Sequence, residues 1–171
     1  MKYFYDTEFI DDGHTINLIS IGIVAEDGRE YYAVSSEFTE HEVLANRWLV
    51  ENVWPHLPHD GLRLDTSHPD VRSRHRIARE VYDFFLPATD LDTLPDVELW
   101  GFYADFDHVC LTRLWGRMID VPEGLPMLTY DLKQEADRLG VQLPQQASGK
   151  HHALADARHN RTRAEALQLM P

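Results

Sequence analysis

The sequence predicts an α/β domain with a mixed β-sheet flanked by helices, and two patterns support this prediction. The first 35 residues contain three strand-like segments separated by two short turns, which favours antiparallel pairing. Strand-like and helix-like segments then alternate, which is typical of parallel strands joined by helices. The chain has 171 residues and is 43% hydrophobic, so residues 1–171 are expected to form a single domain with a sizeable core.

The three N-terminal strands are expected at residues 2–10, 16–25 and 29–35. The first is rich in aromatic residues and stops at the turn sequence Asp11-Asp12-Gly13. The second, INLISIGIVA, is mostly apolar and rich in β-branched residues, as expected of a buried central strand. The turn sequence Glu26-Asp27-Gly28 separates it from the third. Two short turns between three strands predict an antiparallel meander.

The remainder of the chain alternates between helical and extended patterns. Helices are expected at residues 42–53, 71–85, 106–118, 132–139 and 153–169, where apolar residues recur at helical spacing. Shorter strands are expected at residues 97–103 and 127–130. Prolines and a glycine within residues 55–69 predict an irregular surface loop.

The composition is acidic, with 16 lysines and arginines against 29 aspartates and glutamates, a formal net charge of −13. This balance argues against a protein that coats DNA, RNA or anionic lipid, because such binding depends on basic surface. A nucleic-acid enzyme remains compatible with it, because carboxylates that hold metal ions count as negative until the ions bind.

The chain contains one cysteine, Cys110, and no long apolar run. A disulfide framework and a cysteine-based zinc site are therefore excluded, and Cys110 is expected to be a small buried side chain. No segment reaches the ~20 apolar residues of a membrane span, and the N-terminus lacks a signal-peptide pattern. A cytoplasmic location without membrane contact is the expectation.

Two carboxylates in the first strand form the most unusual pattern of the sequence. Asp6 and Glu8 are separated by one residue within YFYDTEF, and strand side chains alternate between faces, so both project from the same face. Burial of two neighbouring like charges is costly unless something neutralises them. A divalent cation such as Mg²⁺ or Mn²⁺ suits oxygen ligands of this kind. The alternative is a strand edge with two solvated acids.

A second acidic element follows the strand expected at residues 97–103. Asp105 and Asp107 come directly after it, and the carboxyl ends of strands in α/β sheets are where active sites usually form. The alternative is that one of these aspartates caps the following helix. By itself this element is only a weak indication of an active site.

The third element is KHHALADA at residues 150–157. Asp156 is expected in the first turns of the last helix, and His151 directly before that helix. A neutral imidazole at this place could accept a proton from a water molecule. His152 and His159 have no comparable placement and are expected at the surface.

Taken together, Asp6-x-Glu8, Phe106-Asp107 and His151-x-Ala153-x-x-Asp156 resemble the three-motif signature of the DEDDh 3′-to-5′ exonucleases of the ribonuclease H-like superfamily. The resemblance covers essentially the whole domain. Residues 3–35 resemble most closely the small bacterial polyadenylate-specific 3′-exoribonucleases. The combined signature is specific, whereas Asp-x-Glu alone occurs by chance in many chains. The fold implied is a ribonuclease H-like mixed sheet, with three antiparallel strands followed by parallel strands, flanked by helices.

The resemblance also implies the roles of these residues. Asp6, Glu8, Asp107 and Asp156 correspond to the acids that hold two Mg²⁺ or Mn²⁺ ions per site, and His151 corresponds to the general base. The implied activity is hydrolysis of single-stranded RNA from its 3′ end, releasing nucleoside 5′-monophosphates, with polyadenylate as the candidate preferred substrate. Many relatives are homodimers, so a homodimer is expected.

The family pattern chooses between neighbouring residues at two positions. In its third motif the histidine lies five residues before the aspartate, which selects His151 over His152. In its second motif the acid follows an aromatic residue, which selects Asp107 over Asp105. The sequence departs from the pattern just before the second motif, where many relatives have an asparagine and this chain has none.

Substrate contacts are expected next to the first motif. Thr7, Glu8 and Phe9 are candidates for binding the terminal nucleotide, and Phe9 either stacks on the last base or packs within the strand. Residues 71–76, VRSRHR, are locally basic. They are expected to be a solvated helix start, with phosphate binding as the alternative. The four tryptophans are expected in the core or in a dimer contact.

Two other functions compete with the exoribonuclease. One is a DNA 3′-exonuclease of the same superfamily, such as a proofreading subunit. The other is a non-catalytic nucleic-acid or protein-binding module on a decayed nuclease fold, against which all five motif positions are intact.

Overall fold

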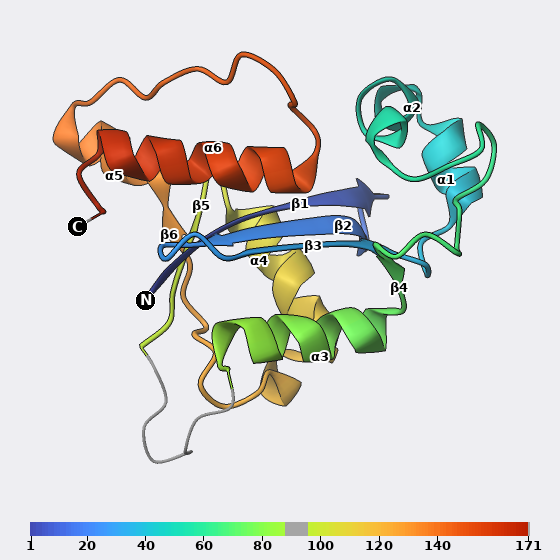
Figure 1. The fold of residues 1–171 in the computed structure, drawn as a ribbon, viewed down its shortest axis with the longest axis horizontal. Coiled ribbons are helices and arrows are strands. Elements are labelled where there is room, and N and C mark those ends of the chain that lie inside the picture. The colour runs from blue at the N-terminus through green and yellow to red at the C-terminus, as the bar shows by residue number, and fades with distance from the viewer. Residues whose placement is uncertain (88–95, 171) are drawn as a thin grey trace.

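The computed structural model describes residues 1–87 and 96–170, and its centre is a six-stranded mixed sheet (Figure 1). The strand order is β4-β3-β2-β1-β5-β6. The antiparallel strands are β1 (Lys2–Asp11), β2 (Ile16–Ala25) and β3 (Glu30–Ser35). The parallel pairings add β4 (Val71–Arg72), β5 (Glu98–Gly101) and β6 (Tyr130–Asp131). The predicted fold class, three antiparallel strands followed by parallel strands, is confirmed.

Helices cover both faces of this sheet (Figure 1). Helix α6 (Ala153–Ala166) lies across β1 and β2 on one face, and α5 (Leu132–Leu139) packs beside it. Helices α3 (Arg74–Phe85) and α4 (Asp105–Thr112) lie on the opposite face. Within the described ranges, none of the helices has the length and apolar character needed to cross a membrane.

The helix expected at residues 42–53 is two short helices, α1 (Glu40–Ala45) and α2 (Arg47–Asn52), beyond one end of the sheet. The break occurs at Asn46, whose backbone is extended and whose side chain accepts hydrogen bonds from the N–H groups of Trp48 and Leu49. An asparagine that caps a new helix in this way interrupts the preceding one. A 3₁₀ turn, η1 (Trp54–His56), follows.

The boundaries of two other predicted helices also differ. Residues 71–72 form β4, and Ser73 then caps α3 by accepting a hydrogen bond from the N–H of Arg76. The helix expected at residues 106–118 ends at Thr112 and continues as two 3₁₀ turns, η3 (Arg113–Trp115) and η4 (Met118–Asp120). Between them Gly116 has a φ of 93°, a conformation that favours glycine and ends a helix.

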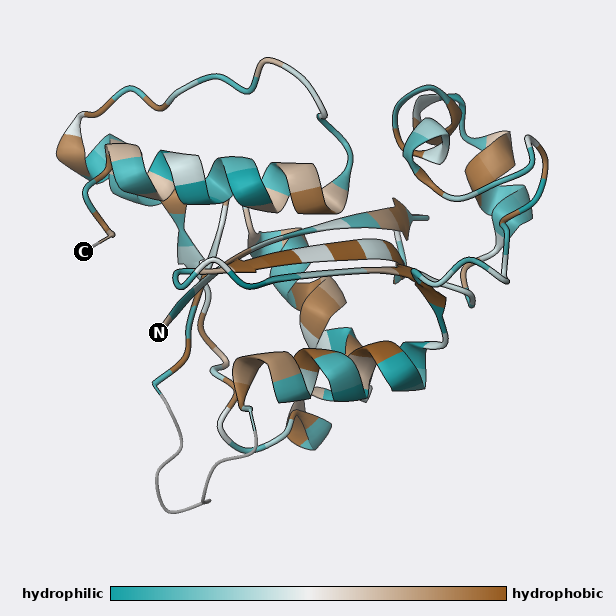
Figure 2. Ribbon diagram, viewed as in Figure 1, coloured by the Kyte–Doolittle hydropathy of each residue, from teal (hydrophilic) through white to brown (hydrophobic). Residues whose placement is uncertain are grey.

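Successive side chains of β1 point to opposite faces of the sheet and therefore pack into separate core clusters. Tyr3 and Tyr5 are buried against α3 and α4, whereas Phe4 on the other face packs against α5 and α6. Ile10, farther along that second face, packs under α1 and α2. Figure 2 shows hydrophobic residues along the central strands. Asp6 and Glu8 therefore lie between two apolar clusters, on the face that α6 covers.

One glycine allows α6 to reach this position. Gly22 of β2 is the register partner of Asp6, and a Cβ atom at Gly22 would overlap the backbone of Ala153 and Leu154. Because Gly22 has no side chain, the first turn of α6 lies directly on the sheet beside Asp6. This close approach carries the residues before and within that turn to the carboxylates of β1.

Candidate active site

Three elements that are distant in the sequence surround one cavity of about 250 Å³. β1 contributes Asp6 and Glu8, α4 contributes Asp107, α6 contributes Asp156, and the segment just before α6 contributes His151. Thr7 and Phe9 also line the cavity. The structure thus brings together all seven residues singled out from the sequence.

Asp107 is held against the open edge of β1. β5 pairs with β1 only near its start, between Lys2 and Phe4, so the edge of β1 beyond that point is available to other groups. The backbone N–H of Thr7 donates to Oδ1 of Asp107 at 2.7 Å, and Oγ1 of Thr7 donates to the same oxygen at 2.6 Å. Asp107 is only 9% exposed. Its position therefore depends on β1 as much as on its own helix.

The helix-capping alternative for these aspartates is wrong. Ala104 is the N-cap residue of α4, and neither Asp105 nor Asp107 makes a side-chain capping bond. Asp105 is exposed at the first position of the helix, whereas Asp107 is buried and bonded to β1. Of the two neighbours, Asp107 therefore lines the cavity, and its role as a metal-binding acid stays a prediction.

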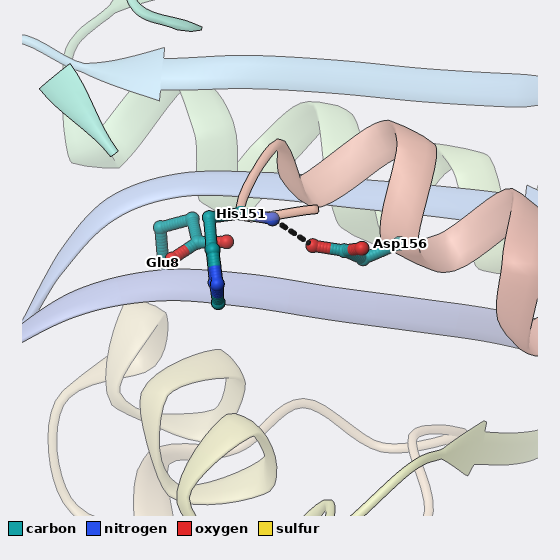
Figure 3. A group of neighbouring side chains, drawn as sticks. All are labelled: Glu8, His151 and Asp156. Atoms are coloured by element: carbon teal, nitrogen blue, oxygen red, sulfur yellow. Dashed lines mark hydrogen bonds between the residues drawn. The ribbon is translucent and has the colours of Figure 1, made fainter. Parts of the chain in front are cut away.

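His151 has a strained backbone that Asp156 stabilises (Figure 3). The φ angle of His151 is 65°, in the left-handed region that side chains other than glycine rarely adopt. Its backbone N–H donates to Oδ2 of Asp156 at 2.7 Å. Its ring contacts the ring of Trp48 edge to face, with centroids 4.8 Å apart. Both contacts fix the imidazole beside the carboxylates.

Glu8, His151 and Asp156 form a group of potential metal ligands (Figure 3). Each offers one ligand atom, and these atoms all lie within 4.8 Å of one another. Two carboxylates and an imidazole at this spacing suit a divalent cation, for which oxygen and nitrogen donors are ordinary ligands. Asp6 and Asp107 line the same cavity outside this compact group.

Burial and mutual repulsion raise the pKa values of the site's acids. Burial, followed by the charges of Asp156 and Asp107, raises the pKa of Glu8 to about 8. Burial and the same kind of repulsion, from Asp107 first, raise the pKa of Asp6 well above its ordinary value. Burial raises the pKa of Asp107 to about 6, although the hydrogen bonds from Thr7 oppose this rise. These shifts arise because several buried carboxylates share one cavity.

Arg163 is the one cation of α6 that faces this cluster, and the sequence reasoning missed it. Its guanidinium lies 3.7 Å from the ring centroid of Phe102 and donates to the side chain of Asn160 at 2.7 Å. Asn160 in turn donates to the backbone oxygen of Tyr5 at 3.0 Å. The charge of Arg163 lowers the pKa of Asp6. Asn160 and Arg163 follow Asp156 by four and seven residues, a spacing that places all three on one side of a helix. This spacing was the signal in the sequence that could have identified Arg163.

Phe9 lines the cavity and also packs against protein. The pairing of β1 with β2 shifts by one residue between Glu8 and Phe9, because β2 has an extra residue, Ile19, at this point. The ring of Phe9 stacks on that of Phe106, with centroids 6.2 Å apart and planes at 21°. Base stacking by Phe9 stays a prediction.

Other expected positions are corrected by the structure. His152 and His159 are not surface residues: His152 is half-buried and stacks on Tyr32, with ring centroids 4.7 Å apart, and His159 contacts the backbone oxygen of Pro144. Trp48 is 50% exposed and lies outside the core, so a dimer contact stays the expectation for this residue. Cys110 is buried, as expected.

Comparison with known proteins identifies the family. The model of the Rv2179c-like 3′-5′ exoribonuclease domain matches residues 1–168. The 3′-5′ exoribonucleases Rv2179c and MT2234.1 of two Mycobacterium tuberculosis strains are 45% identical to the chain over 159 residues, covering 92% of the chain and 88% of each relative.

Solved structures share the fold at low sequence identity. Pop2p of S. pombe, in an Mg²⁺- and Mn²⁺-bound form, matches with a TM-score of 0.54 and 15% identity, over 96% of this chain and 81% of that one. A structure of the yeast NOT1 MIF4G domain co-crystallised with CAF1 matches with a TM-score of 0.50 and 13% identity, over 98% and 80%. From the family match and the 45% identity of its relatives, the chain belongs to the Rv2179c-like 3′-5′ exoribonuclease domain family.

Proposed function

We propose that this protein is a metal-dependent exoribonuclease of the DEDDh type, which removes nucleoside 5′-monophosphates one at a time from the 3′ end of single-stranded RNA. The observation that carries the proposal is the convergence of four carboxylates and His151 on one cavity. Membership of a 3′-5′ exoribonuclease family supports the direction and the substrate.

Asp6, Glu8, Asp107 and Asp156 would hold two Mg²⁺ or Mn²⁺ ions. The raised pKa values of the first three support this assignment, because buried like charges require cations nearby. Four carboxylates that line one cavity supply the oxygen ligands that such ions prefer. When bound, two divalent ions supply charge neutralisation, a more acidic water and stabilisation of the leaving oxygen.

His151 is proposed as the general base. It precedes α6 rather than lying within it, and the hydrogen bond from its backbone N–H to Asp156 leaves the imidazole ring itself free to take part in proton transfer. One ring nitrogen of a neutral imidazole accepts a proton from the attacking water. The contact with Trp48 holds the ring plane in place for this step.

The terminal nucleotide is proposed to bind beside Thr7, Glu8 and Phe9. These residues line the cavity at the end of β1, and the Phe9 ring offers an apolar face for a base. A free 3′-hydroxyl suits a site rich in carboxylates, whereas a 3′-phosphate would meet repulsion in a partly desolvated environment. Polyadenylate is the proposed preferred substrate, on the resemblance of residues 3–35 to polyadenylate-specific enzymes.

A homodimer is the proposed assembly. Exposed apolar side chains between α4 and β6 support it, among them Met118, Ile119 and Leu128, which are 67%, 73% and 57% exposed. Apolar side chains exposed to this extent favour a protein interface.

The test is incubation of end-labelled RNA and DNA oligomers of varied 3′ sequence with Mn²⁺, with Mg²⁺ and with a chelator. The expected result is a ladder that shortens by single nucleotides on single-stranded RNA with a 3′-hydroxyl, and no reaction with the chelator. A 3′-phosphate or a duplexed 3′ end should slow the reaction, since a terminal base must leave its stack to enter the pocket.

Three results would contradict the proposal. Cleavage of a circular RNA would exclude an exonuclease, because a circle offers no end. Full activity with the chelator would exclude metal dependence. Faster hydrolysis of DNA than of RNA would favour a DNA 3′-exonuclease instead.

A further inference from the structure

A second polar cavity, of about 300 Å³, lies at the turn between β1 and β2. His14 and Asn17 line it from that turn and the start of β2, Arg74 from the start of α3, and Val109 and Arg113 from α4 and the turn after it. Two arginines and a histidine thus face one hollow. None of its lining residues is acidic, although the chain as a whole has a formal net charge of −13.

The locally basic segment of residues 71–76 contributes only Arg74 to this cavity. Arg72 and Arg76 both pair with Glu80, at 3.0 Å and 2.7 Å. In the described part of the chain, Arg74 has no carboxylate at ion-pair distance. Its Nη2 donates instead to the backbone oxygen of Arg113 at 3.4 Å. This contact brings the two arginines of the cavity together.

Two acids near this cavity, Asp12 and Glu37, accept hydrogen bonds from backbone N–H groups and form no ion pair with these arginines. Oδ1 of Asp12 accepts from the N–H groups of His14 and Thr15 at 2.8 Å and 2.6 Å, within the turn. Glu37 accepts from the backbone N–H of Arg74 at 2.9 Å, at the start of α3. The positive charge of Arg74 and Arg113 is therefore available to an anionic ligand.

An apolar surface connects this cavity with the candidate active site. Phe106, Val109 and Arg113 are spaced by three and four residues, so they share one side of α4 and the turn after it. Phe106 stacks on Phe9, which lines the active-site cavity beside Glu8. Arg113 lies ~10 Å along the helix axis from Phe106. A strand leaving the active site along this side would reach the arginines.

We propose that Arg74 and Arg113 bind a backbone phosphate of the RNA strand, upstream of the terminal nucleotide in the active site. The inference rests on the proposed exoribonuclease function and names a further subsite for its substrate. Guanidinium groups bind phosphate oxygens with paired hydrogen bonds. Phosphate contacts position a strand without reading its sequence, so this cavity favours long substrates irrespective of their bases.

The experiment compares a dinucleotide with a long single-stranded oligoribonucleotide. Arg74→Ala and Arg113→Ala are each expected to raise the KM for the long substrate roughly tenfold, the effect of losing one charged hydrogen bond. Their kcat and KM for the dinucleotide should match the wild type, because a dinucleotide does not reach the cavity. Arg76→Ala, which removes the same charge from an arginine paired with Glu80, should leave both substrates unaffected.

Binding without catalysis supplies the second measurement. Fluorescence anisotropy of labelled long RNA in the presence of chelator gives the dissociation constant as a function of salt. Removal of one phosphate contact should reduce the slope of log K against log salt by about 0.7. Arg74→Lys should keep the salt slope while it weakens binding, because it retains the charge and loses the paired hydrogen bonds.

The outcomes separate this inference from the proposed function. If the wild type hydrolyses neither substrate, the proposed function fails. If the wild type is active and both alanine variants keep the wild-type KM and salt slope on long RNA, the phosphate subsite is refuted. Equal losses on the dinucleotide and the long RNA would refute it as well, since they indicate a general structural effect.

Discussion

The pH dependence of unfolding offers a sharp test of the electrostatics of the candidate active site. Glu8 is 7% exposed, and burial together with the charges of Asp156 and Asp107 raises its pKa from 4.5 to about 8. Glu8→Gln replaces the carboxyl group with a neutral amide of nearly the same shape. The variant is therefore expected to remove the part of the pH dependence that arises from this carboxyl group.

The sign follows from proton linkage. A carboxyl group with a raised pKa in the folded state binds its proton more tightly there than in the unfolded state. Its stabilising contribution is complete below pH 4.5 and is lost as the pH rises through about 8. At about 1.4 kcal/mol per pH unit, the loss over this range is on the order of 5 kcal/mol. The metal-free wild type should therefore become less stable as the pH rises.

Denaturant unfolding of the metal-free protein across this pH range, with chelator present, measures the effect. The free energy of unfolding should fall with pH much more steeply for the wild type than for Glu8→Gln. Glu42→Gln, at an exposed position in α1, is the control and should follow the wild type. Parallel profiles for the wild type and Glu8→Gln would falsify the burial of this charge. Added Mg²⁺ should restore stability to the wild type at high pH, because a bound cation supplies the missing counter-charge.

Four further substitutions test the geometry. Asp6→Ala should abolish hydrolysis while the metal-free protein unfolds with an unchanged or higher free energy, because repulsion is relieved; a near wild-type rate with Mg²⁺ would contradict the role of this residue. His151→Ala should lower turnover roughly 10²–10⁴-fold with metal binding largely kept, as calorimetry would show. His152→Ala should leave turnover nearly unchanged and cost about 1 kcal/mol of stability, through the loss of its stacking on Tyr32; reversed phenotypes would move the base to His152. Gly22→Ala should lower both the unfolding midpoint and the turnover, with a stability loss of roughly 1–3 kcal/mol, because its Cβ would overlap the first turn of α6; wild-type values of both would show that this contact is not needed.

Local pattern was sufficient for the three N-terminal strands and for the first acidic motif. Alternation along residues 2–10 placed Asp6 and Glu8 on one face, and β1 has that alternation, with Phe4 and Ile10 buried on the same side. The two Gly-containing turns predicted the antiparallel meander that β1, β2 and β3 form. Such features depend on residues close together in the chain, which the sequence displays directly.

Prediction from local pattern failed in two situations. In one, a side chain formed hydrogen bonds with backbone groups and ended a helix; in the other, a residue was buried by elements distant in the sequence. Helical periodicity continued through Asn46, but the side chain of this residue caps a new helix and breaks the first. His152 resembled a surface residue because nothing near it in the sequence indicated the ring of Tyr32 on β3. Arg163 escaped notice because Phe102, which its guanidinium covers, and Asp6, whose carboxylate it faces, come from distant parts of the chain.

The sequence by itself determined the residue types of the candidate site, their order, and the secondary structure that carries each of them. Only the tertiary structure decided their environment. Thr7 and Asp107 are 100 residues apart and share two hydrogen bonds, and the absence of a side chain at Gly22 allows α6 to approach β2 beside Asp6. The physical reason is that desolvation and charge repulsion depend on which groups surround a carboxylate in space, and in this protein those groups come from β1, α4 and α6.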